Sequence, residues 1–127
     1  MKEPEWVLPE VVRAAHEQSL AQFGGPSGIR DETLLESALD KPRNLFAYAE
    51  PNHFDLAASY AFGIITNHPF ADGNKRTGFL VAVVFLELNG YRFAANEVDA
   101  ALQTLALAAG EVSEKQYASW LKTNVRN

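Results

Sequence analysis

The chain has 127 residues and a net charge of −5 at neutral pH, from 16 acidic residues against 11 Lys and Arg. This length suits one domain with one hydrophobic core, so we expect a single domain over residues 1–127. The absence of cysteine excludes disulfides, thiol catalysis and thiolate metal sites. Non-specific nucleic-acid binding depends on neutralising phosphates, and an acidic chain therefore predicts no direct nucleic-acid partner.

The N-terminus lacks the basic and then apolar layout of a signal peptide. No apolar run approaches the roughly 20 residues that cross a bilayer. We therefore expect a cytoplasmic protein with no membrane partner.

The first half of the chain has a helical pattern. Pro9 suits the first position of a helix, which the pair Gly24-Gly25 ends. Asp31 is a good N-cap for a short second helix, and Pro42 is expected to end it. Residues 43–52 are compatible with either a helical turn or a loop.

Two further helices are predicted at about residues 54–66 and 73–88, with a turn between them. The later one is apolar almost all round, which predicts that it is the buried centre of the fold. Residues 91–93 form a short extended piece, and no segment shows the alternation typical of a strand.

The last two helices have recognisable N-caps. Asn96 and Ser113 are the expected caps, with Asp99 and Gln116 at the capping-box positions. The fold class is therefore all-α, a compact single-domain bundle of about six helices around a central hydrophobic helix.

The most informative segment is the turn at residues 67–77, which leads into the apolar helix. Backbone N–H groups at a helix N-terminus attract anions, and Gly73 allows a phosphate to approach the backbone closely. Arg76 can bind phosphate oxygens in a bidentate manner, Lys75 adds a second charge, and Asn74 can donate from its amide. Two adjacent cations oppose the helix dipole, which favours a bound anion.

The same turn contains an acid and a base. Asp72 is either an N-cap or ion-pair partner, or the carboxylate that holds Mg²⁺ together with substrate phosphates. His68 is either a helix C-terminal residue or a base that takes a proton from a hydroxyl attacking the phosphate. Phe70 is expected to point inward as a structural anchor of the motif. The combination of these residues favours the functional alternatives.

This segment resembles the Fic/Doc family motif, His-x-Phe-x-Asp/Glu-Gly-Asn-Gly-Arg, at His68, Phe70, Asp72, Gly73, Asn74, Lys75 and Arg76. Two departures favour the Doc branch, the death-on-curing toxins of toxin–antitoxin pairs. Lys75 replaces the second glycine of the motif, and Phe79 stands where a second arginine is common. The resemblance extends from about residue 16 to residue 120.

The resemblance implies chemistry on ATP or another nucleoside triphosphate, with Mg²⁺ as cofactor. Fic enzymes transfer AMP to a protein hydroxyl, whereas Doc proteins resemble kinases that pass the terminal phosphate to a Thr or Ser. The implied target is the translation factor Tu (elongation factor Tu), with arrest of translation. By position, the resemblance makes His68 the base and Asp72 the Mg²⁺ ligand, and the phosphates are held by Gly73, Asn74, Lys75 and Arg76. The stem of Lys75 would occupy the space that glycine leaves for a pyrophosphate and would favour a reversed nucleotide.

The resemblance also implies a small Phd-like antitoxin in trans, whose C-terminal segment folds into a groove on the toxin. The first helix around Arg13, His16 and Glu17 is a candidate for this groove, and ordinary surface is an equal alternative. Two alternative functions stay open at this point. One is a Fic-like protein AMP-transferase, and the other is a non-catalytic co-repressor that binds the antitoxin.

Overall fold

The computed structural model describes residues 2–126, which form six helices and one small two-stranded sheet. The helices are α1 (Pro9–Phe23), α2 (Glu32–Tyr48), α3 (His53–Asn67), α4 (Asn74–Leu88), α5 (Glu97–Ala108) and α6 (Glu114–Thr123). The strands β1 (Arg92–Phe93) and β2 (Val125–Arg126) are antiparallel, with Arg92 opposite Arg126 and Phe93 opposite Val125. The expected all-α fold is confirmed, and β1 lies in the piece predicted to be extended.

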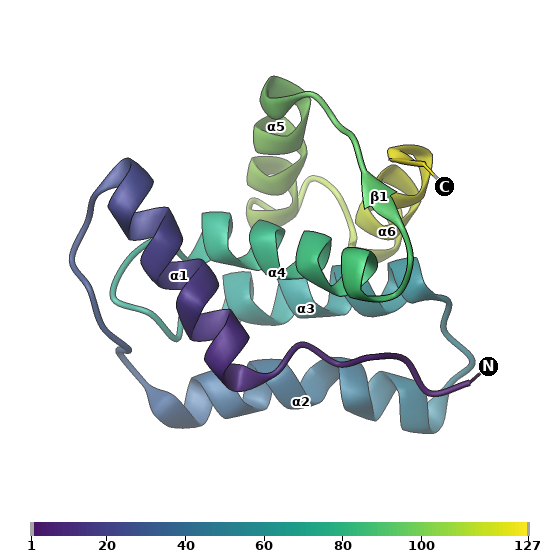
Figure 1. Ribbon diagram of the computed structural model, residues 1–127, viewed down its shortest axis with the longest axis horizontal. Helices are drawn as coiled ribbons and strands as arrows, with labels where there is room; N and C mark the ends of the chain where they lie inside the picture. The colour runs from purple at the N-terminus through teal and green to yellow at the C-terminus, as the bar shows by residue number, and fades with distance from the viewer. Residues whose placement is uncertain (1, 127) are drawn as a thin grey trace.

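Figure 1 shows α3 and α4 side by side in the middle of the molecule, with α2 on one side and α5 and α6 on the other. Helix α1 packs across α4. The core between these helices is almost inaccessible to solvent at Leu56, Tyr60, Ile64, Val81, Phe85 and Leu121. Helix α4 is central, as predicted, but α3 is the more buried of the two because α2, α4 and α6 all pack against it.

Helix α2 does not end at Pro42, so that expectation was wrong. The helix continues through the buried Pro42 to Tyr48. Proline has no N–H to donate to the carbonyl of Ala38, which in a helix interior costs about 3 kcal/mol. Packing of the buried face of α2 against α3 outweighs this cost. The fit is tight, because a Cβ added at Gly63 of α3 would lie 3.1 Å from the Ala38 carbonyl oxygen.

The predicted helix caps are formed in most cases. The Asp31 side chain accepts a hydrogen bond from the N–H of Leu34 at 3.0 Å. Ser113 and Gln116 form a complete capping box at the start of α6. These ends depend on neighbours three residues apart, which explains why local sequence predicts them.

Helix α5 has its predicted cap, Asn96, but the expected capping-box residue Asp99 binds α6 instead. Asn96 accepts from the N–H of Asp99 as expected, but the Asp99 carboxylate accepts from the indole N–H of Trp120 at 2.7 Å. A second bond, of 2.9 Å, joins the hydroxyls of Thr104 and Tyr117. Burial raises the pKa of Tyr117 to about 12, so this phenol stays protonated in the core.

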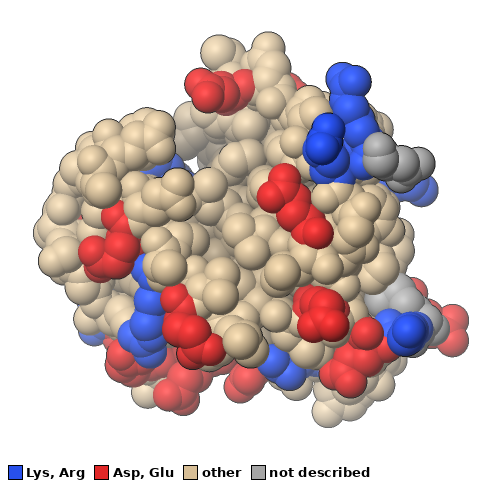
Figure 2. Space-filling model, viewed as in Figure 1, with Lys and Arg blue, Asp and Glu red and all other residues tan. Residues whose placement is uncertain are grey.

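The surface carries small separate groups of charges. On the face shown in Figure 2, Lys and Arg gather at a few places, one of them near the C-terminal end of the chain, among scattered Asp and Glu. None of the helices formed by residues 2–126 combines the length and the apolar character needed to cross a bilayer.

Candidate active site at the N-terminus of α4

The loop between α3 and α4, residues 68–73, contains most of the predicted site and is here called the motif loop. It runs beside the loop that joins α1 to α2 (Figure 1). The N–H of Arg30 donates to the carbonyl of Pro69 at 2.7 Å, and the N–H of Ala71 donates to the carbonyl of Gly28 at 3.1 Å. Backbone bonds to a distant segment therefore fix the path of the motif loop.

His68 is exposed and its backbone is strained. Among residues 2–126 it is the only non-glycine residue with a positive φ, at 51°, where it ends α3 in a left-handed conformation. Such a conformation costs about 1–3 kcal/mol and persists where surrounding contacts enforce it. Arg30 supplies those contacts, because its Nε donates to the His68 carbonyl at 2.8 Å and its Nη2 to the Asn67 carbonyl at 3.2 Å.

Phe70 and Asn74 together close the motif loop. Phe70 is buried, with 1% of its surface exposed. The Asn74 side chain accepts from the N–H of Phe70 at 3.0 Å and donates to the Phe70 carbonyl at 3.1 Å. The side-chain amide that we expected to donate to a phosphate therefore uses one of its two N–H groups within the loop. Asn74 can also offer a ligand its backbone N–H at the start of α4.

Asp72 has an exposed side chain and a backbone held from α1. Its carbonyl oxygen lies 2.8 Å from Nε2 of His16, and since a carbonyl only accepts, Nε2 carries the proton. The His16 ring is buried and stacks on Phe70, with centroids 3.9 Å apart. The Asp72 carboxylate lies against Gly25, where an added Cβ would overlap Oδ2. Gly25 thus leaves the space that the carboxylate occupies.

Gly73, Lys75 and Arg76 surround the start of α4. Among residues 2–126, no side chain caps the first-turn N–H groups, because the N-cap is Gly73 with φ 78°. Arg76 is half-buried, and its Nε donates to Ser19 Oγ at 2.9 Å. A Cβ at Gly73 would lie 3.5 Å from Nη2 of Arg76, so the guanidinium is beside the open helix end. Lys75 is exposed.

A groove lies next to the motif loop, between α1 and the start of α2. Its volume is about 370 Å³, and it is lined by Arg13, His16, Glu17, Gly28, Ile29, Glu32 and Phe70. Arg13 and Glu32 form a bidentate pair at 3.1 and 3.0 Å, and this hydrogen bonding lowers the pKa of Glu32. The α1 residues proposed from sequence as an antitoxin groove thus lie along a real depression.

Comparison with known proteins identifies the family. The family model described as "Fic/DOC family" matches residues 6–86, more than half of the chain. The chain belongs to the Fic/DOC family. A curated relative, "Protein kinase doc" of Escherichia phage P1, is 30% identical over 117 residues, covering 91% of this chain and 92% of the relative. Another, "Toxin Doc" of Mycolicibacterium smegmatis, is 39% identical over 82 residues, covering 62% and 63%. The resemblance to the Doc branch is confirmed.

The residues at the helix end of this Fic/DOC protein fit a metal-bound triphosphate chemically. The open N–H groups of α4 and the guanidinium of Arg76 are anion donors, and Gly73 has no Cβ to fill the space between them. One exposed carboxylate, Asp72, is the kind of ligand with which Mg²⁺ binds substrate phosphates. His68 ends the preceding helix with a side chain open to solvent.

Three residues that hold the Fic/DOC motif were missed or misread from sequence. Arg30 and Ser19 had no predicted role, and His16 was considered only as part of a groove. Each acts on a residue far along the chain, with separations of 38, 57 and 56 residues. Nothing in their local sequence indicates these contacts.

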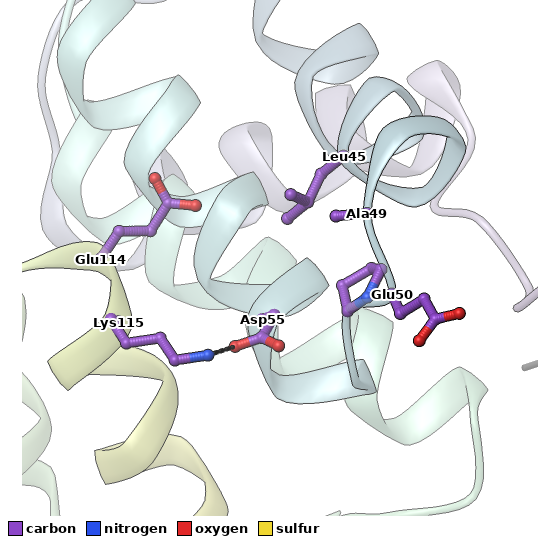
Figure 3. Close-up of a pocket in the computed structure, with 7 residues that line it drawn as sticks. Leu45, Ala49, Glu50, Asp55, Glu114 and Lys115 are labelled. Atoms are coloured by element: carbon purple, nitrogen blue, oxygen red, sulfur yellow. Dashed lines mark hydrogen bonds and ion pairs between the residues drawn. The ribbon is translucent and has the colours of Figure 1, made fainter.

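A second hollow of about 340 Å³ lies at the opposite end of α3 from the motif loop (Figure 3). It is lined by Leu45, Ala49, Glu50, Pro51, Asp55, Glu114 and Lys115. Two of its carboxylates are paired within the protein: Asp55 with Lys115 at 3.3 Å, as Figure 3 shows, and Glu114 with Lys41 at 2.8 Å. This hollow therefore offers a ligand fewer unpaired polar groups than the N-terminus of α4 does.

Proposed function

We propose that this Fic/DOC protein is the toxin of a toxin–antitoxin pair and acts as a protein kinase. It transfers the terminal phosphate of ATP, or of another nucleoside triphosphate, to a Thr or Ser of elongation factor Tu and so arrests translation. The observation that carries the proposal is the open N-terminus of α4, with His68, Asp72 and Arg76 around it. The names of the relatives, a protein kinase and a toxin, support the same function.

The phosphates of the nucleotide bind at the N-terminus of α4. The first-turn N–H groups and Arg76 donate hydrogen bonds to the phosphate oxygens, and Lys75 contributes a further positive charge. Asp72 would hold Mg²⁺ together with the triphosphate, and the ion would supply positive charge to neutralise the transferred group. Little covalent chemistry is required of the protein, because phosphoryl transfer depends mainly on positioning and charge stabilisation.

His68 acts as the general base. It takes the proton from the target hydroxyl while that oxygen forms a bond to the terminal phosphorus. The bond from this phosphorus to the bridging oxygen breaks, and the nucleoside diphosphate leaves with the electron pair. An exposed side chain on a backbone held by Arg30 suits this task, because the hydroxyl arrives on another protein.

Lys75 favours transfer of the terminal phosphate over transfer of AMP. It stands in the first turn of α4, where glycine would leave room for a pyrophosphate against the backbone. The lysine stem occupies this room, so that the nucleotide binds in the reverse direction and presents its terminal phosphate to His68.

The partner that controls the toxin is a Phd-like antitoxin, and we place its C-terminal segment in the groove between α1 and the start of α2. The groove offers the apolar side chain of Ile29 and the charged groups of Arg13, Glu17 and Glu32. A short amphipathic segment matches this mixture.

The proposal is tested by labelling. The protein is incubated with elongation factor Tu and with triphosphate labelled separately at the α and γ positions. We expect only γ label on the factor, and a loss of at least about 100-fold in His68→Ala, because general bases contribute 10²–10⁴-fold. His53→Gln, which changes a histidine outside the site, is the matched control and keeps activity. Label that reaches protein only from the α position would overturn the kinase assignment.

Growth provides the second measurement. Expression without an antitoxin should arrest growth, and His68→Ala should relieve the arrest while the variant unfolds at the wild-type temperature. If His68→Ala were as toxic as the wild type, a catalytic role would be contradicted, and a non-catalytic binding role would remain as the explanation of the arrest.

A further inference from the structure

Helix α1 reaches the candidate site with three side chains on one face. His16, Ser19 and Phe23 are spaced at i, i+3 and i+7, which places them along the same side of a helix. His16 donates to the Asp72 carbonyl, and Ser19 accepts from Arg76. The guanidinium carbon of Arg76 also lies 4.8 Å from the centroid of the Phe23 ring.

The contact between Ser19 and Arg76 determines which nitrogens of the guanidinium remain available. Ser19 is 1% exposed, so its hydroxyl is a fixed acceptor rather than a mobile surface group. With Nε bonded to Ser19, the guanidinium keeps the N–H groups of Nη1 and Nη2 for a ligand. Among residues 2–126, no carboxylate forms a salt bridge with Arg76, although the protein is acidic.

Phe23 restricts the same side chain from a second direction. It is 60% exposed, which is a poor environment for a large apolar ring, and the ring packs against the guanidinium of Arg76. The ring and the Ser19 hydroxyl together hold Arg76 next to Gly73.

His16 performs the corresponding task for the motif loop. The ring is 2% exposed and is located between Phe70, on which it stacks, and the Asp72 carbonyl, to which it donates. The bond fixes the backbone of the residue that carries the proposed Mg²⁺ ligand. Because Gly73 follows directly, the same bond sets the start of α4.

We propose that His16 and Ser19 are positioning residues for phosphate binding, so that α1 sets the geometry of Asp72 and Arg76 on the motif. This inference rests on the proposed function, since it assigns a purpose to contacts around the same site. Neither residue touches the nucleotide. His16 acts through Asp72, the proposed Mg²⁺ ligand, and Ser19 acts through Arg76, a proposed phosphate donor.

The first test compares Ser19→Ala with Val12→Ala. Val12 is fully buried in α1 and belongs to the hydrophobic core, so its truncation weakens the packing of α1 without removing a hydrogen bond to the motif loop. Ser19→Ala should raise the Kd for ATP with Mg²⁺, measured by calorimetry, about 3- to 10-fold, the range expected for one hydrogen bond. Val12→Ala should lower the melting temperature more and leave the Kd within about 2-fold.

The second test separates the ring of His16 from its donor. His16→Phe keeps an aromatic ring to stack on Phe70 but leaves the Asp72 carbonyl without its donor, whereas His16→Gln keeps a donor. We expect His16→Phe to raise the Mg²⁺ concentration for half-maximal nucleotide binding several-fold, and His16→Gln to restore part of this loss. Wild-type binding by both Ser19→Ala and His16→Phe, with folded protein, would overturn the inference.

A nucleotide-free measurement distinguishes the inference from the proposed function. The Nε–H of Arg76 should give a protected arginine signal in a ¹⁵N NMR spectrum of the wild type, and Ser19→Ala should lose this protection. If the wild type binds no nucleotide, the proposed function fails and the inference fails with it as a statement about phosphate binding. If the wild type binds nucleotide but Ser19→Ala keeps the protected signal, only the inference fails.

Discussion

His68, Asp72 and Lys75 expose their side chains around the start of α4, whereas Phe70 and Asn74 in the same motif are buried. The exposed residues are available to a nucleotide and a target protein. The buried ones hold the loop in shape, because Asn74 satisfies both the N–H and the carbonyl of Phe70. The residues of one motif thus divide into exposed ones, to which we assign the chemistry, and buried ones that hold the loop.

This division predicts that substitutions at two neighbouring residues affect different properties, stability at Asn74 and nucleotide binding at Lys75. Asn74→Ala leaves a buried N–H and a buried carbonyl of Phe70 unpaired, which should lower the free energy of unfolding by roughly 2–4 kcal/mol. Lys75→Ala removes an exposed side chain, should change stability by less than about 0.5 kcal/mol, and should weaken ATP binding. Urea unfolding and calorimetry measure the two effects. If Asn74→Ala were as stable as the wild type, the two bonds from Asn74 to the Phe70 backbone would contribute nothing to stability.

At the scale of helices, two glycines allow close packing on either side of α3. A Cβ at Gly63 would lie 3.1 Å from the Ala38 carbonyl oxygen of α2. A Cβ at Gly78 of α4 would lie 3.0 Å from the Ala61 carbonyl oxygen of α3. The three central helices therefore touch through backbone, which brings the end of α3 and the start of α4 together at the motif loop.

Alanine should therefore destabilise both positions, although in an open helix it stabilises by about 0.5–1 kcal/mol relative to glycine. We expect Gly63→Ala and Gly78→Ala to lower the free energy of unfolding by about 1–3 kcal/mol, as overpacked sites do. Ser119→Ala, at an exposed position of α6, serves as the control for helix propensity and should be neutral or stabilising. An increase in stability for either glycine variant would contradict the close packing.

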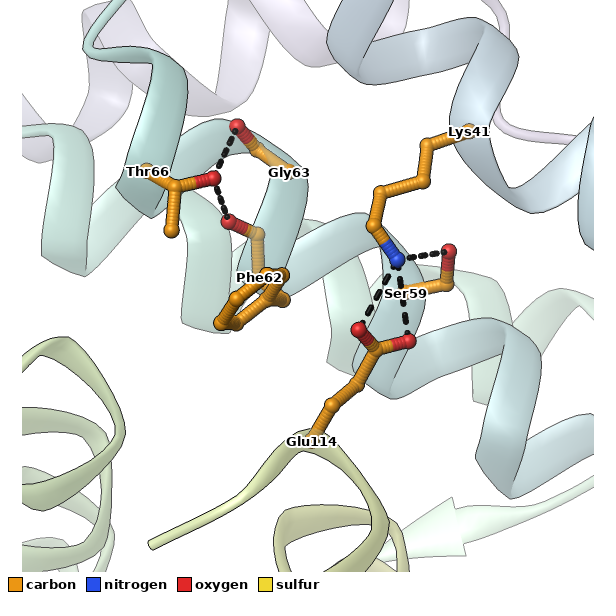
Figure 4. A network of polar contacts seen from close by, with 6 residues as sticks. All are labelled: Lys41, Ser59, Phe62, Gly63, Thr66 and Glu114. Atoms are coloured by element: carbon orange, nitrogen blue, oxygen red, sulfur yellow. Dashed lines mark hydrogen bonds and ion pairs between the residues drawn. The ribbon is translucent and has the colours of Figure 1, made fainter. Parts of the chain in front are cut away.

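At the scale of the whole molecule, one lysine connects three helices far from the candidate site. Figure 4 shows Lys41 of α2 donating to Glu114 of α6 at 2.8 and 3.0 Å and to Ser59 of α3 at 3.3 Å. Its ammonium nitrogen also lies 5.3 Å from the centroid of the Phe62 ring. Lys41 thereby attaches the C-terminal helix to the central pair.

The strength of this attachment can be measured by a double-mutant cycle with Lys41→Met and Glu114→Gln. The two side chains are 36% and 28% exposed, and we expect a coupling energy of about 1 kcal/mol that decreases with salt. The pair Lys115 and Asp55 is the control, because Lys115 is 81% exposed and its coupling should stay below about 0.5 kcal/mol. Equal coupling in both pairs would refute the role assigned to Lys41.

The helical content and the caps were predictable because they depend on near neighbours. Ser113 and Gln116 form their capping box within one helical turn, and Pro9 begins α1 as expected. Pro42 misled the prediction, since its local preference to end a helix is weaker than the packing of α2 on α3. Asn96 caps α5 as expected, but Asp99, expected to complete the capping box, instead accepts from Trp120, which lies 21 residues away.

The sequence by itself determined the motif, the family and the all-α fold, because these depend on residue types at fixed short spacings. Only the tertiary structure decided how the motif is held. Arg30 bends the backbone at His68, His16 and Ser19 position Asp72 and Arg76, and Asn74 is used within the loop. Apart from the bonds of Asn74, these contacts join residues more than 35 positions apart, and side chains so distant in sequence meet only after the helices have packed.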